Sequence, residues 1–117
     1  MIAPPAGVRV LVALRPVDFR KGMDGLAALV KATLAEDPFC GTVYVFRAKR
    51  ADRVKLVYWD GSGMVLVAKR LEKAQFKWPA VRDGAMRLSP AQLAALFEGL
   101  DWSRVHVPEV ARPTAVQ

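Results

Sequence analysis

The chain has 117 residues, enough for one domain whose hydrophobic core needs no disulfide or metal ion. Hydrophobic residues make up 53% and charged residues 25% of the sequence, which excludes wholesale disorder and collagen-like repeats. The 18 Lys and Arg residues outnumber the 11 Asp and Glu residues, so the formal net charge is +7. The single Cys40 and the single His106 exclude an internal disulfide and a zinc site built from several Cys or His ligands.

No membrane or secretion signal is evident. The N-terminal residues lack a basic segment followed by an apolar one, and no apolar run approaches the ~20 residues that span a bilayer. We therefore expect a cytoplasmic protein from a reducing compartment, without a membrane anchor.

The excess positive charge lies in the middle third of the chain. Residues 44–82 contain ten basic and three acidic side chains, whereas the rest of the chain contains eight of each sign. Such a cluster attracts phosphate groups, because the fields of neighbouring charges add. A solvated sheet face that Lys and Arg keep soluble has the same composition. Charge alone leaves both interpretations open.

The first third of the chain predicts a strand and a helix. Residues 8–12 alternate and are β-branched, which is typical of a strand. An irregular connector follows over residues 15–22. Asp24 is expected to cap a helix over residues 25–35, whose apolar residues recur at helical spacing. Residues 37–41 then form a turn.

Three strands are predicted next, over residues 42–47, 53–59 and 64–70. An Asp-Gly pair at positions 60 and 61 is the strongest short-range hairpin signal and joins the last two strands. One face of this hairpin is nearly all apolar, whereas the other combines Trp59 with cationic and apolar side chains. We favour packing of that mixed face under a helix. An open face of this kind would suit stacking of single-stranded nucleic acid.

The last third predicts a short strand and a second helix. Residues 74–78 alternate and end at a proline, which favours a short strand. Ser89, Pro90 and Gln92 predict a helix start with an N-cap, a first-turn proline and a capping box, and Gly99 is its expected stop. The predicted fold is α+β, an antiparallel β-meander packed by two α-helices in a single domain over residues 1–102. Residues 103–117, with His106, are expected to form a weakly ordered, solvated tail.

No set of residues suggests catalysis. Asp18, Asp24 and Asp60 form no metal site in this interpretation, because a helix cap and a turn explain the last two. Ser62 lies in a hairpin turn rather than in a nucleophile elbow. Cys40 has no acid–base partner nearby in the sequence and is interpreted as a turn or core thiol. We therefore predict no enzyme activity, no cofactor and no bound metal.

Several stretches together resemble a known family. They are residues 15–26 (RPVDFRKGMDGL), 37–41 (DPFCG), 45–47 (VFR), 55–61 (KLVYWDG), 69–72 (KRLE), 76–79 (FKWP) and the helix within 88–102. In this order and spacing they resemble TnpB, the second-open-reading-frame accessory protein of insertion-sequence-66-type transposable elements. The resemblance covers roughly residues 8–102 and depends on no single motif. It implies an accessory protein, encoded beside a separate, larger transposase and needed for efficient transposition, that does not itself cleave DNA.

The leading hypothesis is a non-enzymatic accessory factor that contacts DNA at transposon ends through its basic segment. Phosphate contacts are predicted for Arg47, Lys49, Arg50, Arg53, Lys55, Lys69 and Arg70, with Trp59 as a stacking platform.

The alternative is an adaptor that docks on the transposase without binding nucleic acid itself. Its predicted recognition loop combines Phe19 with the charged residues Arg15, Asp18, Arg20 and Lys21, a composition suited to an interface hot spot. An ordinary connector that Phe19 anchors in the core would have the same sequence features. A nuclease or hydrolase is a third and less favoured class, which would require metal-dependent cleavage through Asp18 or Asp60. The oligomeric state stays open.

Overall fold

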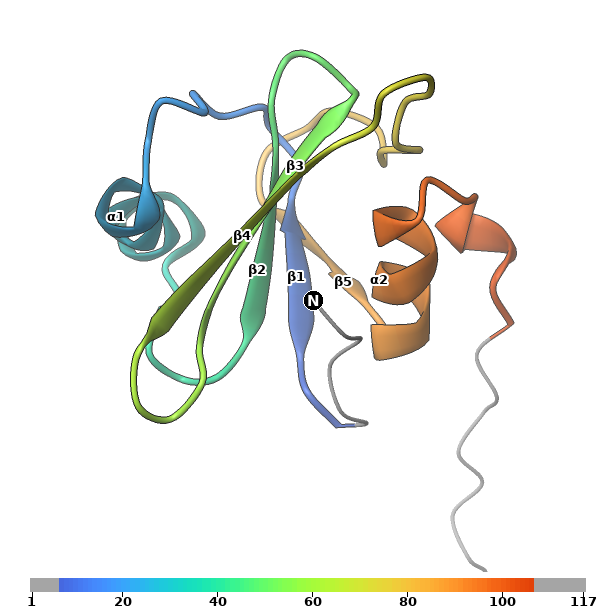
Figure 1. Cartoon of the computed structure of the whole chain (residues 1–117). Helices are drawn as coiled ribbons and strands as arrows, with labels where there is room; N and C mark the ends of the chain where they lie inside the picture. Colours follow the sequence, from blue (N-terminus) through green and yellow to red (C-terminus); the bar gives the residue numbers. More distant parts are fainter. Residues whose placement is uncertain (1–6, 107–117) are drawn as a thin grey trace, which may run out of the picture.

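A five-stranded sheet forms the centre of the molecule (Figure 1). A computed structural model describes residues 7–106. The strands are β1 (Val10–Ala13), β2 (Val43–Arg47), β3 (Arg53–Trp59), β4 (Met64–Arg70) and β5 (Ala85–Leu88), and their order in the sheet is β4-β3-β2-β1-β5. With helices α1 (Met23–Leu34) and α2 (Pro90–Phe97), this confirms the predicted α+β class.

The sheet is mixed rather than wholly antiparallel. Strand β1 runs parallel to β2, whereas β2–β3, β3–β4 and β1–β5 are antiparallel pairs. Parallel neighbours need a crossover connection, and α1 supplies it between β1 and β2. The antiparallel meander is therefore confirmed for β2, β3 and β4 alone.

The β3–β4 hairpin has the predicted bounds and a four-residue turn. Trp59 pairs with Met64 across the turn. The Asp60 carboxylate accepts hydrogen bonds from the backbone N–H groups of Ser62 and Gly63, at 2.9 and 3.0 Å. Gly61 has a φ of 106°, a conformation that glycine adopts without steric cost. Asp60 is thus the turn residue that the sequence indicated.

Helix α1 begins earlier than predicted. Its N-cap is Gly22, and no side chain caps it, so the prediction that Asp24 is the cap is wrong. Asp24 lies instead in the first turn, where a carboxylate interacts favourably with the positive end of the helix dipole. The helix buries Leu26 and Val30 against the sheet.

Helix α2 begins as its sequence predicted. The Ser89 hydroxyl accepts a hydrogen bond from the Gln92 backbone N–H at 3.0 Å, and the Gln92 side chain accepts one from the Ser89 N–H at 2.9 Å. This reciprocal capping box satisfies two backbone donors that the helix itself leaves free. Gly99, with a φ of 80°, follows the helix end.

The strand predicted over residues 74–78 is wrong. Residues 71–84 contain no strand, and the alternation there arises because Phe76 is buried and Trp78 packs against the same core. The Phe76 backbone N–H donates to Ala51 O at 2.9 Å, and Trp78 Nε1 donates to the same oxygen at 3.1 Å. The last strand forms at Ala85–Leu88, where it pairs with the remaining edge of β1.

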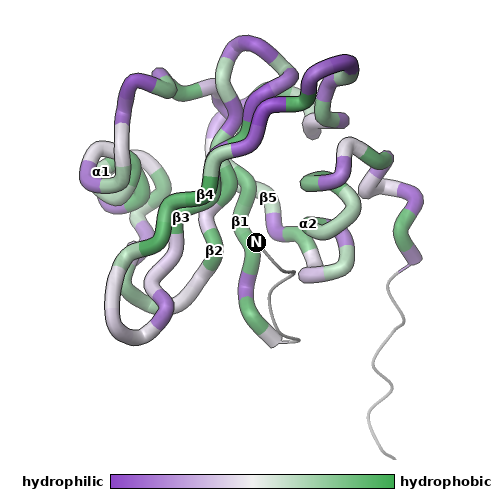
Figure 2. The backbone as a smooth tube through the Cα atoms, viewed as in Figure 1, coloured by the Kyte–Doolittle hydropathy of each residue, from purple (hydrophilic) through white to green (hydrophobic). Residues whose placement is uncertain are grey.

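Helices cover both faces of the sheet (Figure 1). On one face, Leu26 and Val30 of α1 pack on Tyr44, Phe46 and Val57. On the other face, Leu93 and Leu96 of α2 pack on three strands. Their partners are Val10 and Val12 of β1, Val45 of β2 and Leu56 of β3. Figure 2 shows the resulting contrast between hydrophobic strands and hydrophilic loops at one end of the sheet.

This packing decides between the two interpretations of the mixed hairpin face. Met64 and Leu66 pack in the cluster under α1, so the part of this face next to the hairpin turn is covered, as favoured. Trp59 is half-buried, and its ring meets the Phe39 ring edge-on with centroids 5.8 Å apart.

A short 3-10 helix, η1 (Trp102–Arg104), follows α2 and includes the start of the predicted tail. Trp102 Nε1 donates a hydrogen bond to Lys77 O at 2.7 Å, and His106 is exposed. Residues 107–117 of that tail lie outside the described residues.

Candidate nucleic-acid interface

Three loops meet at one end of the sheet, which we call the loop end (Figure 1). They are the connector from β1 to α1, the β2–β3 turn and the β4–β5 loop. Backbone hydrogen bonds hold them in place: Val17 donates to Arg47 O at 2.8 Å, and Leu71 donates to Asp52 O at 2.9 Å. The loop end is therefore a defined surface rather than a set of independent loops.

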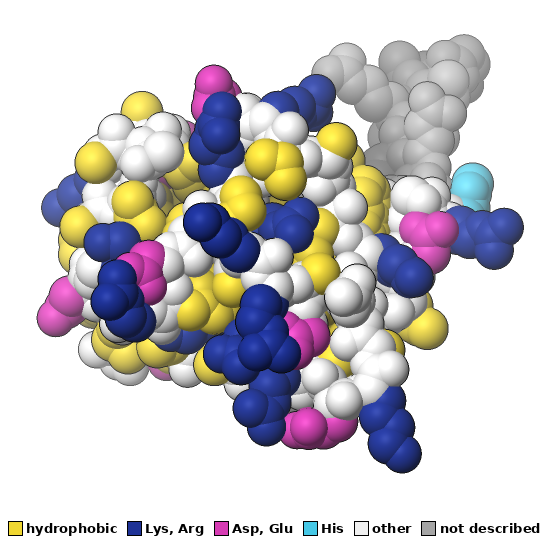
Figure 3. Space-filling view, turned by 90° about the horizontal axis from the view of Figure 1, so that it is seen from above, with side chains coloured by type: hydrophobic (Ala, Val, Ile, Leu, Met, Phe, Trp, Pro, Cys, Tyr) yellow, Lys and Arg dark blue, Asp and Glu magenta, His cyan; other side chains and the backbone are white. Residues whose placement is uncertain are grey.

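Parts of the two sets of residues predicted for DNA contact and for partner docking meet at the loop end. One groove runs between the connector and the β2–β3 turn and is lined by Asp18, Phe19, Arg20, Lys49, Arg50 and Arg53. A second groove shares Phe19 and Arg53 and continues along the hairpin past Lys55 and Arg70. Figure 3, seen from above the loop end, shows Lys and Arg side chains around apolar atoms on this face.

Lys55 holds the connector in position. Its Nζ donates hydrogen bonds to Phe19 O at 2.7 Å and to Lys21 O at 3.0 Å, and it lies 5.0 Å from the centroid of the Phe19 ring. With two hydrogen bonds and a cation–π contact inside the protein, the Lys55 ammonium group has little capacity left to bind a phosphate. Lys55 thereby fixes the position of Phe19 between the two grooves.

Arg47 and Lys69 reach toward the α2 side of the sheet. Lys69 Nζ donates a hydrogen bond to Phe97 O at 2.8 Å and lies 4.6 Å from the Phe97 ring centroid. The Arg47 guanidinium lies 5.4 Å from the Trp78 ring centroid, and burial lowers the pKa of Arg47. Side chains of a strand alternate between faces, so the side chains of these two residues leave the sheet on the face opposite to Arg53, Lys55 and Arg70, although Lys69 also borders the second groove.

The remaining predicted cations are more accessible. Lys49 and Arg50 are exposed in the β2–β3 turn, and Arg50 forms an ion pair with Asp52 at 3.3 Å. Arg70 forms an ion pair with Glu72 at 3.2 Å. Both guanidinium groups stay more than half exposed in these pairs, so solvent screens the pairs and a phosphate can compete with the carboxylates for these groups.

Asp18 and Arg20 organise the connector. Arg20 donates to both oxygens of Asp18, with its Nη2 2.7 Å from Oδ2, and the Arg20 backbone N–H donates to Oδ1 at 2.9 Å. These hydrogen bonds hold the pKa of Asp18 at about 2. The pair keeps Arg20 on the rim of the first groove.

The structure does not bring Trp59 to the loop end. Arg53 begins β3 at the loop end and Trp59 is the last residue of that strand, which places them roughly 20 Å apart at ~3.4 Å per residue. Sequence reasoning also missed Lys73, which lines a groove at the loop end with Lys49 and Arg50. Lys73 belongs to the basic segment, so charge alone could have included it.

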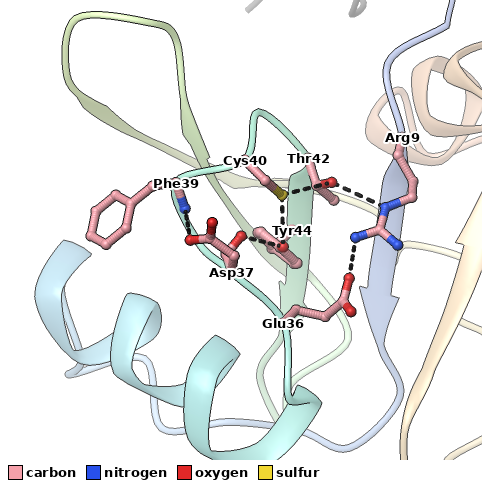
Figure 4. Close-up of polar contacts among 7 residues, drawn as sticks. All are labelled: Arg9, Glu36, Asp37, Phe39, Cys40, Thr42 and Tyr44. Carbon is pink, nitrogen blue, oxygen red and sulfur yellow. Dashed lines mark hydrogen bonds and ion pairs between the residues drawn. The ribbon is translucent and has the colours of Figure 1, made fainter.

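A separate polar cluster lies at the opposite end of the sheet (Figure 4). Arg9 pairs with Glu36 and donates to Thr42 Oγ1 at 3.1 Å, while the Tyr44 hydroxyl donates to Asp37 O at 2.8 Å. These contacts join β1, β2 and the end of α1.

Cys40 is an exposed thiol in this cluster, with Sγ 3.3 Å from Thr42 Oγ1 and 3.5 Å from Tyr44 Oη. Partial burial opposes its ionisation, but hydrogen bonds with Thr42 and Tyr44 and the charge of Arg9 prevail and lower the pKa of Cys40. Burial, together with the neighbouring Cys40, raises the pKa of Tyr44. The interpretation of Cys40 as a turn thiol fits this position.

Among residues 7–106, no group of three or more His, Cys, Asp and Glu side chains is placed to hold a metal ion. No helix in that part of the chain has the length and apolar character needed to cross a membrane.

Comparison with known proteins decides the family. The model of the protein family described as "IS66 Orf2 like protein" matches residues 8–107 of the chain. The chain belongs to the IS66 Orf2-like family. The resemblance noted in the sequence is thereby confirmed, and the IS66 Orf2-like proteins are accessory, non-catalytic components of transposition.

Two relatives of Sinorhizobium fredii (strain NBRC 101917 / NGR234) match over nearly their whole length. The protein y4jC is 54% identical over 116 residues, and y4hO is 39% identical over 116 residues; each alignment covers 99% of both chains. No solved structure matches the chain.

Proposed function

We propose that this IS66 Orf2-like protein acts in the cytoplasm and binds the phosphate backbone of transposon-end DNA at its loop end. The observation that carries the proposal is the convergence of Arg20, Lys49, Arg50, Arg53 and Arg70 on two adjoining grooves. These side chains come from three segments that are distant in the sequence, and their fields add at one surface.

The chemistry of the grooves suits a polyanion. Lys49 and Arg50 are exposed, and Arg50 and Arg70 keep more than half of their side-chain surface exposed in their ion pairs with Asp52 and Glu72. A bound phosphate replaces such pairs at small cost and releases counterions from the DNA. Phe19, half-buried and held beside Lys55, offers an apolar surface between the cations for a sugar or an unstacked base.

A specific observation also supports the adaptor hypothesis. Arg15 and Val17 of the connector line an apolar hollow of about 220 Å³ with Leu29, Leu34 and Phe46. Arg15 forms an ion pair with Asp83 at its rim, and both side chains are largely exposed. A side chain of the transposase could enter this hollow and exchange partners with the ion pair.

DNA binding is tested by fluorescence anisotropy with labelled duplexes from the element ends and with unrelated duplexes, at about 50 and about 200 mM salt. The pair Lys49→Ala and Arg50→Ala removes two charges at the loop end. Arg87→Ala and Arg104→Ala, both exposed, remove two charges elsewhere. If each lost cation contacts a phosphate, the first pair lowers the salt slope by about 2, at about 0.9 per contact.

Equal effects of the two double variants, or binding that does not change with salt, would overturn the proposal. Co-purification with the transposase after nuclease treatment separates the two functions. A complex that survives the nuclease and is lost on Arg15→Ala supports the adaptor hypothesis. A complex that depends on DNA supports the phosphate-binding hypothesis.

A further inference from the structure

Strand β4 is an edge of the sheet. It pairs with β3 on one side, and no strand among residues 7–106 pairs with its other side. An edge strand presents backbone donors and acceptors that another chain can bind.

The hydrogen bonds that bracket the β3–β4 hairpin show which residues carry these free groups. The Asp60 N–H donates to Gly63 O at 3.0 Å, and the Leu71 N–H donates to Asp52 O at 2.9 Å. Hydrogen-bonded pairs alternate along an antiparallel ladder, so Val65, Val67 and Lys69 are the β4 residues bonded to β3. The N–H and C=O groups of Met64, Leu66, Ala68 and Arg70 therefore point away from β3.

This edge lacks the features that usually prevent strand pairing. Residues 64–68 (MVLVA) contain no charge and no proline, and the register with β3 is continuous, without a bulge. Met64, Val65, Leu66 and Val67 also remain half-buried rather than buried. The other edge, β5, has four residues and carries the exposed Arg87. Of the two edges, β4 is the one suited to a partner strand.

We propose that β4 pairs with β4 of a second copy of this chain, antiparallel, with Val67 facing its counterpart across a two-fold axis. In this register Leu66 lies opposite Ala68 of the second copy, and Met64 lies opposite Arg70. All the outward-pointing backbone groups then find partners. Apolar side chains meet at the centre, and the small Ala68 leaves room for Leu66.

The charges of β4 favour the antiparallel orientation of this dimer over the parallel one. Lys69 and Arg70 lie at one end of the strand, so antiparallel pairing puts the two copies of Lys69 roughly 14 Å apart and the two copies of Arg70 roughly 20 Å apart. Both distances exceed the Debye length of ~8 Å at physiological salt. Parallel pairing would place like charges about 5 Å apart, which is unfavourable.

The dimer would have one continuous sheet with the two loop ends directed oppositely. A dimer that also binds DNA at its loop ends could hold two DNA segments at once. The dimer itself does not depend on DNA binding, and its test is carried out without DNA.

The first measurement is the mass by light scattering after size-exclusion chromatography, from about 1 to about 100 µM protein. The expected result is a concentration-dependent shift from the 12.9 kDa chain toward twice that mass. Ala68→Pro should abolish the shift, because the exposed Ala68 directs its N–H outward and the substitution removes no bond to β3. Ala68→Thr, which keeps the N–H, is the matched control, and circular dichroism checks that both variants fold.

A second measurement tests the register and does not depend on Ala68→Pro folding. In a Cys40→Ser background, Val67→Cys should form an intermolecular disulfide under mild oxidation, because facing residues in a non-hydrogen-bonded pair have Cα atoms ~4.5 Å apart. Val65→Cys should not, since its counterpart lies four residues away along the strands. A monomer at every concentration, or equal cross-linking at both positions, would overturn the proposal.

Discussion

Lys55 offers the sharpest test of how the loop end is built. Its ammonium group joins the middle of the sheet to the connector through hydrogen bonds to Phe19 O and Lys21 O. Lys55→Met keeps the aliphatic part of the side chain and removes both bonds. A hydrogen bond contributes about 1 kcal/mol net, and more when one partner is charged. Because Lys55 is half-buried, solvent screens part of this, and we expect a total loss of about 1–2 kcal/mol.

The assay is equilibrium unfolding in urea. For a protein of this size the free energy of unfolding falls by about 1–3 kcal/mol per molar urea, so a loss of about 1–2 kcal/mol should lower the midpoint by about 0.3–2 M. Lys49→Met is the control, because Lys49 is exposed in the β2–β3 turn, and its effect should stay within about 0.5 kcal/mol. If Lys55→Met has the same midpoint as Lys49→Met, Lys55 does not hold the connector.

Three further predictions concern single groups. Ser89→Ala should lower the free energy of unfolding by about 1 kcal/mol through loss of the capping box, measured by the urea midpoint relative to wild type; an unchanged midpoint would contradict the capping role. The Asp18 carboxyl should titrate in NMR with a pKa of about 2, so the stabilising interaction with Arg20 is fully present above the ordinary pKa of ~3.9 and is lost as the pH falls through about 2. In Arg20→Gln the pKa of Asp18 should rise, and an unchanged pKa would contradict the role of Arg20. The alkylation rate of Cys40, measured against pH, should reach half its maximum at a lower pH in the folded protein than in the urea-unfolded chain. Tyr44→Phe removes a hydrogen bond to Cys40 and should therefore raise the pH of half-maximal rate in the folded protein. Identical profiles for wild type and Tyr44→Phe would contradict the hydrogen-bond explanation.

Local sequence signals predicted those parts of the fold that local contacts determine. Ser89 and Gln92 are three residues apart and cap α2 without help from the rest of the chain. The Asp-Gly pair at positions 60 and 61 sets a turn whose hydrogen bonds all lie within four residues. In both cases the residues that determine the structure are neighbours in the sequence.

Non-local pairing determined the parts that the sequence did not predict. Residues 74–78 and 85–88 both alternate, and nothing within either segment indicates which one meets β1. Phe76 is buried by core contacts and by a backbone bond to Ala51, so its segment was not available for the sheet. Tertiary context overrides such weak strand propensities.

The candidate interface likewise has one part that the sequence predicted, its positive charge, and one part that depends on the fold, the directions of the side chains. The sum of charges over residues 44–82 identifies a basic segment of the sequence, but a sum carries no information about which face of the sheet each side chain occupies. Alternation along β2 and β4 sends Arg47 and Lys69 toward Trp78 and Phe97, where they stabilise the α2 side. The crossover through α1 instead brings Phe19 and Arg20 to the loop end beside Lys49, Arg50 and Arg53. The connector proposed for docking and the turn proposed for DNA contact therefore line one groove, and a ligand bound in that groove is expected to contact residues of both segments.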